Sequence, residues 1–292
     1  MARFRRARAG RCAGPVRAAP AAFRGPVSKN SDLPKRAVVG LALVGLALAA
    51  LWAGGWGFWL VITVMAVLMI GEWALLAQDE RQRRLAQYVM MVPLAILSPA
   101  AAGPGFLALG LVFGAFFFVA IVTRNAKLAA GQVYVGLPVL ALLLLRDHPQ
   151  GFAATLWTMA IVWVCDSGAY FAGRAIGGPK LAPSISPNKT WAGLIGGLVA
   201  AILFSAGYVA LAPGSAIGWW LVAVSPLVAF ASQIGDLYES HLKRVAGVKD
   251  SSNLLPGHGG ILDRLDGLVF AAPVAALFFA IHHQVVVGGY WW

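Results

Sequence analysis

The stretch "GFLALGLVFGAFFFVAIVTRNAK", residues 105–127, contains the pattern that decides the fold. An apolar run over residues 104–123 is followed at once by a short polar loop with two basic side chains, Arg124 and Lys127. A helix needs about 20 predominantly apolar residues to cross the hydrocarbon of a bilayer, where every backbone polar group must find its partner within the protein. The stretch therefore predicts a transmembrane helix that ends at a basic loop facing water.

The same pattern recurs along the chain. Of 292 residues, 60% are hydrophobic and only 12% are charged, whereas soluble domains are roughly 25% charged. Nine apolar runs approach spanning length, and the first, third and fifth are on the short side. These runs are residues 37–53, 56–78, 86–102, 104–123, 130–146, 152–173, 191–212, 217–238 and 267–288. The expected fold class is all-α, a polytopic integral membrane protein with about nine transmembrane helices.

The basic residues predict an orientation. Residues 1–36 hold ten Lys or Arg and one acid, Asp32, in an Ala-, Pro- and Gly-rich stretch. This composition cannot bury a core, so we expect a disordered basic cytoplasmic tail, with an organelle-targeting peptide as the alternative and no nucleic acid as partner. Nearly every other Lys and Arg follows the second, fourth, sixth or eighth run. The positive-inside rule then predicts an N-in, C-out topology.

Loop length divides the chain in two. Residues 37–129 have short loops and are expected to form a scaffold of transmembrane helices. Residues 130–292 contain both long cytoplasmic loops and are expected to form the catalytic region, with the active site facing the cytoplasm from the inner membrane. No internal repeat is visible, and the two cysteines, Cys12 and Cys165, indicate neither a disulfide framework nor a zinc site.

The chain has only eleven acids, and several lie where charge is costly. Ionisable groups in or beside a span are functional by default. Asp166 lies about two helical turns inside the sixth run, while Asp236 and Glu239 close the eighth run. Asp263 and Asp266 repeat that three-residue spacing where the ninth run begins. Capping explains one acid at a helix N-terminus, but carboxylates converging from two helices indicate a hard-cation site, here Mg²⁺ shared with phosphates.

Glu72 lies in "MIGEWALL", near the cytoplasmic end of the second run. The simplest interpretation is a carboxylate that reaches the membrane interface or pairs with a neighbouring Arg, because interfacial charges cost less than central ones. A functional role is the alternative.

Lys and Asp alternate with turn-forming residues in "SPNKT" and "KDSSN", residues 186–190 and 249–253. Mixed charge with exposed backbone N–H groups suits a polyphosphate bridged by a metal ion. These features indicate metal-dependent phosphoryl or nucleotidyl chemistry at the cytoplasmic face of a membrane.

Residues 240–266, "SHLKRVAGVKDSSNLLPGHGGILDRLD", resemble the signature of phosphatidate cytidylyltransferases (CDP-diacylglycerol synthases). Upstream, "DSGAYFAGRAIGGPKLAPSISPNKTWAG", residues 166–193, is similar to the family's Asp-Ser/Thr-x-Ala-Tyr and Ser-Pro-x-Lys-Thr segments. Ala192 departs from the pattern, because the family usually has Glu there; either that Glu is dispensable or another acid, such as Glu239, takes its role. The signature is matched by Ser240, Lys243, Arg244, Lys249, Asp250, Pro256, Gly257, His258, Gly259, Gly260, Asp263, Arg264 and Asp266.

The resemblance implies a nucleotidyltransferase of phospholipid biosynthesis that converts CTP and phosphatidate to CDP-diacylglycerol and pyrophosphate with Mg²⁺, a second cation being left open. The implied partners are CTP, phosphatidate and membrane lipids, and a homodimer is left open too. The attacking phosphate monoester has a second pKa near 6, so it is mostly dianionic at neutral pH and requires no general base. It does require neutralisation and alignment of two polyanions.

The resemblance also implies roles for individual residues. The acyl chains are expected to enter sideways from the bilayer near Asp236. The backbone N–H groups around the glycines would approach an anion, and His258 would contact a phosphate or only stabilise the turn. Expected catalytic, phosphate-holding residues are Lys243, Arg244, Lys249, His258 and Arg264. Expected substrate contacts are Asp166, Ser186, Asn188, Lys189, Thr190, Asp250, Gly259 and Gly260. Expected metal ligands are Asp236 and Asp263 first, then Asp266 and Asp250.

Two other functions remain open at this point. A CTP-dependent polyprenol or phytol kinase is closest in character, although the full Pro-Gly-His-Gly-Gly signature favours the cytidylyltransferase. An ion-coupled transporter would place its acids near the midplane and often in repeated halves. A CDP-alcohol phosphotransferase is disfavoured because its paired Asp residues stand four apart, whereas "DRLD" has them three apart.

Overall fold

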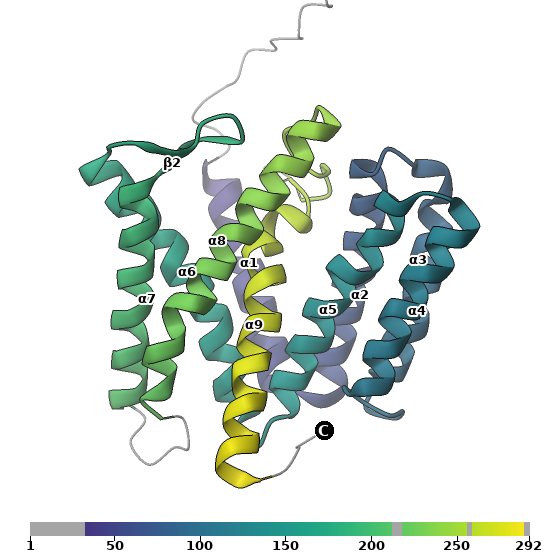
Figure 1. The fold of residues 1–292 in the computed structure, drawn as a ribbon, viewed down its shortest axis with the longest axis horizontal. Coiled ribbons are helices and arrows are strands. Elements are labelled where there is room, and N and C mark those ends of the chain that lie inside the picture. Colours follow the sequence, from purple (N-terminus) through teal and green to yellow (C-terminus); the bar gives the residue numbers. More distant parts are fainter. Residues whose placement is uncertain (1–32, 212–217, 256–258, 289–292) are drawn as a thin grey trace, which may run out of the picture.

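The computed structural model describes residues 33–211, 218–255 and 259–288 of the chain. Most of the expected basic tail therefore lies outside the described residues. The described residues form nine α-helices, one 3₁₀ turn and one β-hairpin (Figure 1). The helices are α1 (Leu33–Ala53), α2 (Gly55–Leu76), α3 (Arg83–Ile96), α4 (Phe106–Thr123), α5 (Ala126–Asp147), α6 (Gly151–Ile176), α7 (Trp191–Leu211), α8 (Trp220–Ala246) and α9 (Leu262–Val287).

Each of the nine predicted runs coincides with one helix, and within the described residues seven of these helices are both long and apolar enough to cross a membrane. The exceptions are α1, whose described apolar part is Val38–Ala53, and α3, which has 14 residues. An all-α membrane protein with seven candidate spans is therefore the architecture that the structure supports. The antiparallel hairpin β1 (Lys180–Ala182) and β2 (Ser186–Thr190) was not predicted, since this stretch was expected to be a loop.

Consecutive helices run up and down, so alternate connections gather at the same end of the bundle (Figure 1). The connections after α2, α4, α6 and α8 lie at the end that carries the β-hairpin, here called the hairpin end. These are the connections that hold most of the basic residues outside the tail. The two motifs of the sequence, residues 166–193 and 240–266, thus meet at one end of the molecule.

Glycines bring α6 and α7 into backbone contact. A Cβ added at Gly168, Gly196 or Gly197 would collide with atoms of the opposite helix. Small residues at such crossings are typical of membrane proteins, where close van der Waals packing replaces the hydrophobic effect between helices. The contact holds α6, which carries Asp166, against the helix that begins directly after the hairpin.

A second close crossing joins α8 to α9. A Cβ on Gly235 would collide with the backbone carbonyl of Asp266, and one on Gly267 would press on Val162 of α6. The two helices therefore touch beside Asp236 and Asp266. The crossing places the acids that close the eighth run next to the acids that open the ninth.

Candidate active site

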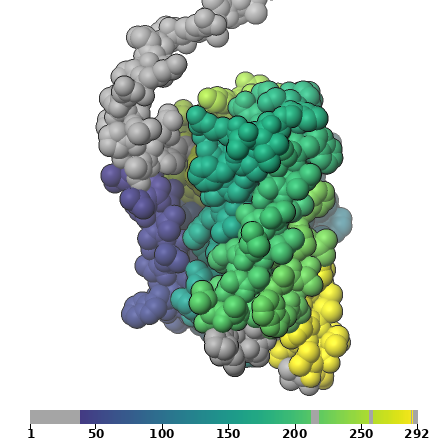
Figure 2. Space-filling view, turned by 90° about the vertical axis from the view of Figure 1, so that its left-hand side faces the viewer, coloured from purple at the N-terminus to yellow at the C-terminus, as the bar shows by residue number. Residues whose placement is uncertain are grey.

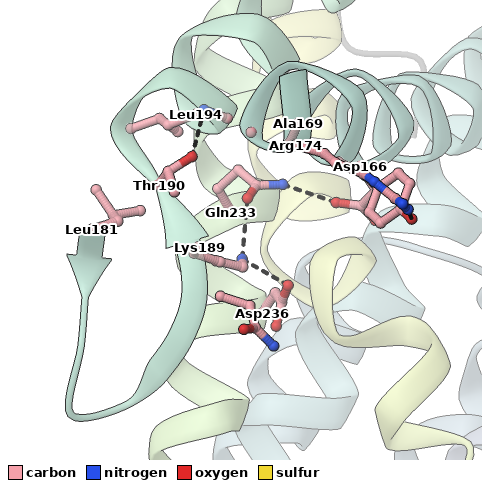
Figure 3. Close-up of a pocket in the computed structure, with 13 residues that line it drawn as sticks. Asp166, Ala169, Arg174, Leu181, Lys189, Thr190, Leu194, Gln233 and Asp236 are labelled. Atoms are coloured by element: carbon pink, nitrogen blue, oxygen red, sulfur yellow. Dashed lines mark hydrogen bonds and ion pairs between the residues drawn. The ribbon is translucent and has the colours of Figure 1, made fainter. Parts of the chain in front are cut away.

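A cavity of about 540 Å³ opens at the hairpin end between α6, the hairpin, α7 and α8 (Figure 3). Its volume falls in the range of roughly 300–1,000 Å³ that is typical of small-molecule sites. We call it the polar cavity. It is lined by Asp166, Ala169, Tyr170, Gly173, Arg174, Leu181, Asn188, Lys189, Thr190, Gly193, Leu194, Gln233 and Asp236.

A chain of hydrogen bonds joins three segments across this cavity. Gln233 Nε2 donates to Asp166 Oδ1 at 2.8 Å, and Lys189 Nζ donates to Gln233 Oε1 at 3.0 Å. Lys189 also forms an ion pair with Asp236 Oδ2 at 2.6 Å (Figure 3). The Ser240 hydroxyl donates to the other oxygen of Asp236 at 3.3 Å. Asp166 and Lys189 of the first motif are thus brought together by the amide of Gln233, and Lys189 joins them to Asp236 on α8.

The position of the hairpin is fixed by the pairing of its two strands and by its connection to α7. Lys180 pairs with Thr190 and Ala182 with Ser186. Thr190 is buried, and its hydroxyl accepts from Gly193 N at 3.0 Å, the bond of an N-cap residue on α7. Four residues of the hairpin were predicted to contact the substrate. Asn188, Lys189 and Thr190 line the polar cavity, and Ser186 does not.

Sequence reasoning missed two groups of the polar cavity on α6 and one on α8. Tyr170 and Arg174 follow Asp166 at intervals of four, and Arg174 Nη1 donates to the Tyr170 hydroxyl at 2.8 Å. The four-residue interval puts all three on one helical face, so "DSGAYFAGR" contained the signal. Gln233 carried no such signal, because a single amide in an apolar run has many ordinary interpretations. Arg174 adds a second cation, with a planar group suited to phosphate.

Asp263 holds the loop between α8 and α9. One oxygen accepts from Lys243 Nζ at 2.6 Å, and the other accepts from Ser251 N at 2.9 Å and Gly260 N at 2.8 Å. Ser251 Oγ lies 2.9 Å from the same oxygen. Both oxygens of this predicted metal ligand are therefore engaged within the protein. Lys243, a predicted phosphate contact, is paired here and also lies 3.4 Å from Glu239 Oε2.

Glu72, on α2, accepts hydrogen bonds from the same loop and from the start of α9. Ile261 N and Leu262 N donate to its two oxygens at 2.9 and 2.8 Å, and Ser252 Oγ donates at 2.6 Å. These N–H groups belong to the first turn of α9, which has no intrahelical acceptors for them. The side chain is only 4% exposed. The interpretation of Glu72 as an interfacial or Arg-paired carboxylate is wrong; it caps α9 across 190 residues of sequence.

In the glycine turn around Gly259 and Gly260, a backbone N–H group donates a hydrogen bond to a carboxylate of the protein itself. Gly260 donates to Asp263, and a Cβ on Gly260 would clash with Ser251 Oγ and Glu72. Gly259 has a left-handed φ of 80°, which suits glycine. His258 and Gly257 lie outside the described residues.

The remaining predicted residues of the signature are spread around this loop. Arg244 Nε donates weakly to the hairpin carbonyl of Ile185 at 3.4 Å. Lys249 and Asp250 are exposed. Arg264 lines a different, apolar cavity. The structure therefore joins only part of the predicted set to the polar cavity.

The acids at the crossing of α8 and α9 differ in the number of hydrogen bonds that their carboxylate oxygens accept. Glu239 is fully buried, and in the described part of the chain neither of its oxygens accepts a hydrogen bond. Asp266 Oδ1 accepts from Gly267 N at 2.7 Å. Within the described ranges, no three His, Cys, Asp or Glu side chains form a ready metal cluster. The oxygen donors match a hard cation in type, and Glu239 is a buried acid whose counterion among the described residues is Lys243, at 3.4 Å from its Oε2.

Comparison with known proteins gives a consistent result. Residues 34–282 match the profile of the cytidylyltransferase family. A phosphatidate cytidylyltransferase of Brucella suis is 43% identical over 260 residues, which cover 86% of this chain and 94% of the relative. One of Pseudomonas aeruginosa is 40% identical over 267 residues, covering 85% and 97%. One of Bacillus subtilis is 39% identical over 150 residues, covering 51% and 56%.

Proposed function

The chain belongs to the cytidylyltransferase family, and from this premise we propose that it transfers the cytidylyl group of CTP to phosphatidate. A phosphate oxygen of phosphatidate forms a bond to the α-phosphorus of CTP, the bond from that phosphorus to the β-phosphate breaks, and pyrophosphate leaves. The products are CDP-diacylglycerol and pyrophosphate. The observation that carries the proposal is the polar cavity, which joins the residue 166–193 motif to Gln233 and Asp236 of α8 at one end of a bundle of membrane helices.

The polar cavity is the proposed site for CTP. Lys189 and Arg174 supply cations for the triphosphate, and Asn188 supplies an amide. Gln233 hydrogen-bonds to both Lys189 and Asp166. These bonds fix the position of the Lys189 ammonium group before a phosphate binds. Positioning and charge neutralisation are the main demands of this reaction, because the dianionic nucleophile needs no base.

We propose Mg²⁺ as the cofactor, with a second cation left open, held by Asp236, Asp263 and Asp266. The close crossing at Gly235 supports this choice, because it sets acids of α8 and α9 side by side. Glu239, fully buried at the same crossing and 3.4 Å from Lys243 Nζ, is a further oxygen donor for the same ion. When bound, Mg²⁺ would neutralise the charge between the two phosphate substrates.

We further propose that the hairpin end faces the cytoplasm from the inner membrane, with α1 and α3 completing nine spans and the C-terminus outside. The gathering of the basic connections at that end supports this orientation through the positive-inside rule. Single cysteines placed at Gln78 and at Ala101 should react with impermeant thiol reagents from opposite sides. The mass of the detergent-solubilised protein decides whether it is a homodimer.

The reaction is tested by pyrophosphate release from detergent-purified protein given CTP, Mg²⁺ and phosphatidate, each omitted in turn. We expect release only with all three, and CDP-diacylglycerol as the lipid product. A polyprenol or phytol kinase would instead release CDP from CTP, and a transporter would consume no CTP. Either result with folded protein would overturn the proposal.

A further inference from the structure

A second cavity, of about 260 Å³, lies between α1, α6 and α9. We call it the α1 cavity. Its walls are apolar, with Val44 from α1, Val162 and Trp163 from α6, and Leu268 from α9. Arg264 is the one charged side chain among the described residues that line it. The cavity therefore combines an apolar interior with a single cation near the hairpin end of α9.

Arg264 differs from Lys189 and Lys243 in that no carboxylate of the described residues neutralises its charge. Lys189 and Lys243 each form an ion pair at 2.6 Å. Across the residues that the structure describes, the Arg264 side chain forms neither an ion pair nor a hydrogen bond, and it is exposed. A guanidinium in this position is suited to a phosphate group, which it binds in a bidentate manner.

The α1 cavity lies next to the polar cavity. Val162 lines the first and Asp166 lines the second, and they stand one helical turn, about 5.4 Å, apart along α6. On α9, Arg264 stands between Asp263 and Asp266, the acids proposed to serve the reaction. A group held at Arg264 is therefore bound to the helix that carries Asp263 and Asp266, beside the α6 segment that lines both cavities.

The α1 cavity also opens toward the surroundings of the helix bundle. Helix α1 packs mainly on α2 and only briefly on α6, and most of its described side chains, such as Leu41, are exposed. In Figure 2, α1 stands apart from α6 and α7, with a hollow between them. In a bilayer, acyl chains surround this helix, so a lipid tail reaches the cavity without crossing water.

We propose that the α1 cavity is the phosphatidate subsite, with one acyl chain inside it and the phosphate on Arg264. This inference rests on the proposed function and names where its lipid substrate binds. It moves the lipid from the vicinity of Asp236, predicted from the sequence, to the opposite side of α9. An anionic head on an apolar tail matches a cavity that has one cation at the end of an apolar wall.

Another apolar cavity provides the comparison. It measures about 620 Å³ and lies between α4, α5 and α9, with Phe117, Tyr134 and Val274 in its lining. It is larger, yet none of its described lining residues is charged. A phosphomonoester would find no counterion there, so size alone does not select the lipid site.

The test narrows each cavity by one matched substitution. Val44→Trp fills the α1 cavity from a lightly packed helix, and Val274→Trp fills the comparison cavity. With Val44→Trp, we expect KM for dioleoyl phosphatidate to rise at least tenfold, while KM for CTP and for dihexanoyl phosphatidate stays within twofold. Val274→Trp should leave all three unchanged. Equal effects of the two variants, or no effect of Val44→Trp, would overturn the proposal.

A binding measurement separates this inference from the reaction itself. Phosphatidate with a photoreactive diazirine on its acyl chain should label peptides of α1 and α6 in wild-type protein, whether or not CTP turns over. Dioleoyl phosphatidate should compete, and diacylglycerol, which lacks the phosphate, should not. Arg264→Gln should reduce the labelling about tenfold or more, the usual scale for a lost charged hydrogen bond. Labelling confined to α4 and α5 would refute the assignment, whereas labelling on α1 without pyrophosphate release would refute only the proposed function.

Discussion

Replacing Glu72 by Gln should loosen the signature loop while the helix bundle stays folded. The substitution preserves shape and removes the charge. Oε1 accepts from Ser252 Oγ and Ile261 N, and Oε2 accepts from Leu262 N and, at 3.2 Å, from Ser251 Oγ. A glutamine has one acceptor oxygen, so whichever way it turns, one backbone N–H of α9 faces an amide donor instead.

The magnitude follows from those contacts. A hydrogen bond to a charged group contributes about 1.5–3 kcal/mol, and a buried donor left unsatisfied costs about 1–3 kcal/mol. One lost backbone bond and the weakening of the other bonds give about 3 kcal/mol in total. Since 1.36 kcal/mol corresponds to a factor of ten, the first turn of α9 should open about 100-fold more often.

Hydrogen exchange measured by mass spectrometry reports this opening directly. In Glu72→Gln, the amides of Ile261 and Leu262 should exchange about 100-fold faster, while peptides of α6 and α7 keep their wild-type rates. Turnover should fall at least tenfold, because Asp263 and Lys243 belong to the same loop junction. Glu80→Gln, the same change at an exposed residue of the adjacent 3₁₀ turn Glu80–Gln82, is the control and should alter neither quantity. Wild-type exchange at the start of α9 in Glu72→Gln would refute the capping role, and faster exchange everywhere would refute its local character.

Three further predictions use other parts of the molecule. Gln233→Leu should reduce pyrophosphate release at least tenfold by cutting the bridge in the polar cavity, with a normal melting temperature; unchanged release would contradict that role. Asp266→Asn should raise the Mg²⁺ concentration needed for half-maximal activity by tenfold or more, and an unchanged Mg²⁺ titration would remove Asp266 from the proposed metal ligands. Burial, with the charges of His283 and His282, lowers the pKa of His148 from 6.5 to about 4. The unfolded chain therefore binds this proton first, so stability is lost as pH falls from about 6.5 toward 4. His148→Gln should reduce the difference in melting temperature between pH 7 and pH 5, and an undiminished difference would show that other groups cause it.

The helices could be read from the sequence because each depends on local composition. The apolar runs that predicted nine spans coincide with nine helices in the structure, because a segment in hydrocarbon must satisfy its backbone by itself. Among the described residues, seven of the nine meet the length and hydropathy of a span. Helix α3 has 14 residues and the described apolar part of α1 is Val38–Ala53, whereas α5 meets both criteria although its run was also on the short side. The hairpin was missed because "KLAPSISPNKT" contains too few apolar residues to show strand alternation.

Part of the site could be predicted as well, and for a similar reason. Asp166 and Lys189 stand in a short motif and Asp236 closes an apolar run, so their chemistry was recognisable wherever the fold placed them. Tyr170 and Arg174 could have been found from their spacing on the same helical face as Asp166.

The contacts of other charged residues depend on which helices pack together, and no local sequence pattern contains that information. Glu72 looked like an interfacial carboxylate until the fold placed it against the first turn of α9. Asp263 was predicted only as a metal ligand, and the fold shows that its oxygens also accept from Lys243 and the loop amides. Arg264 is beside these residues in sequence, yet it faces an apolar cavity across from them. The sequence by itself determined the helices and the kinds of charge at their ends. The partner of each charge was decided by tertiary packing, because a buried carboxylate is satisfied by whichever donors adjoining helices bring to it, and those donors lie up to 190 residues away.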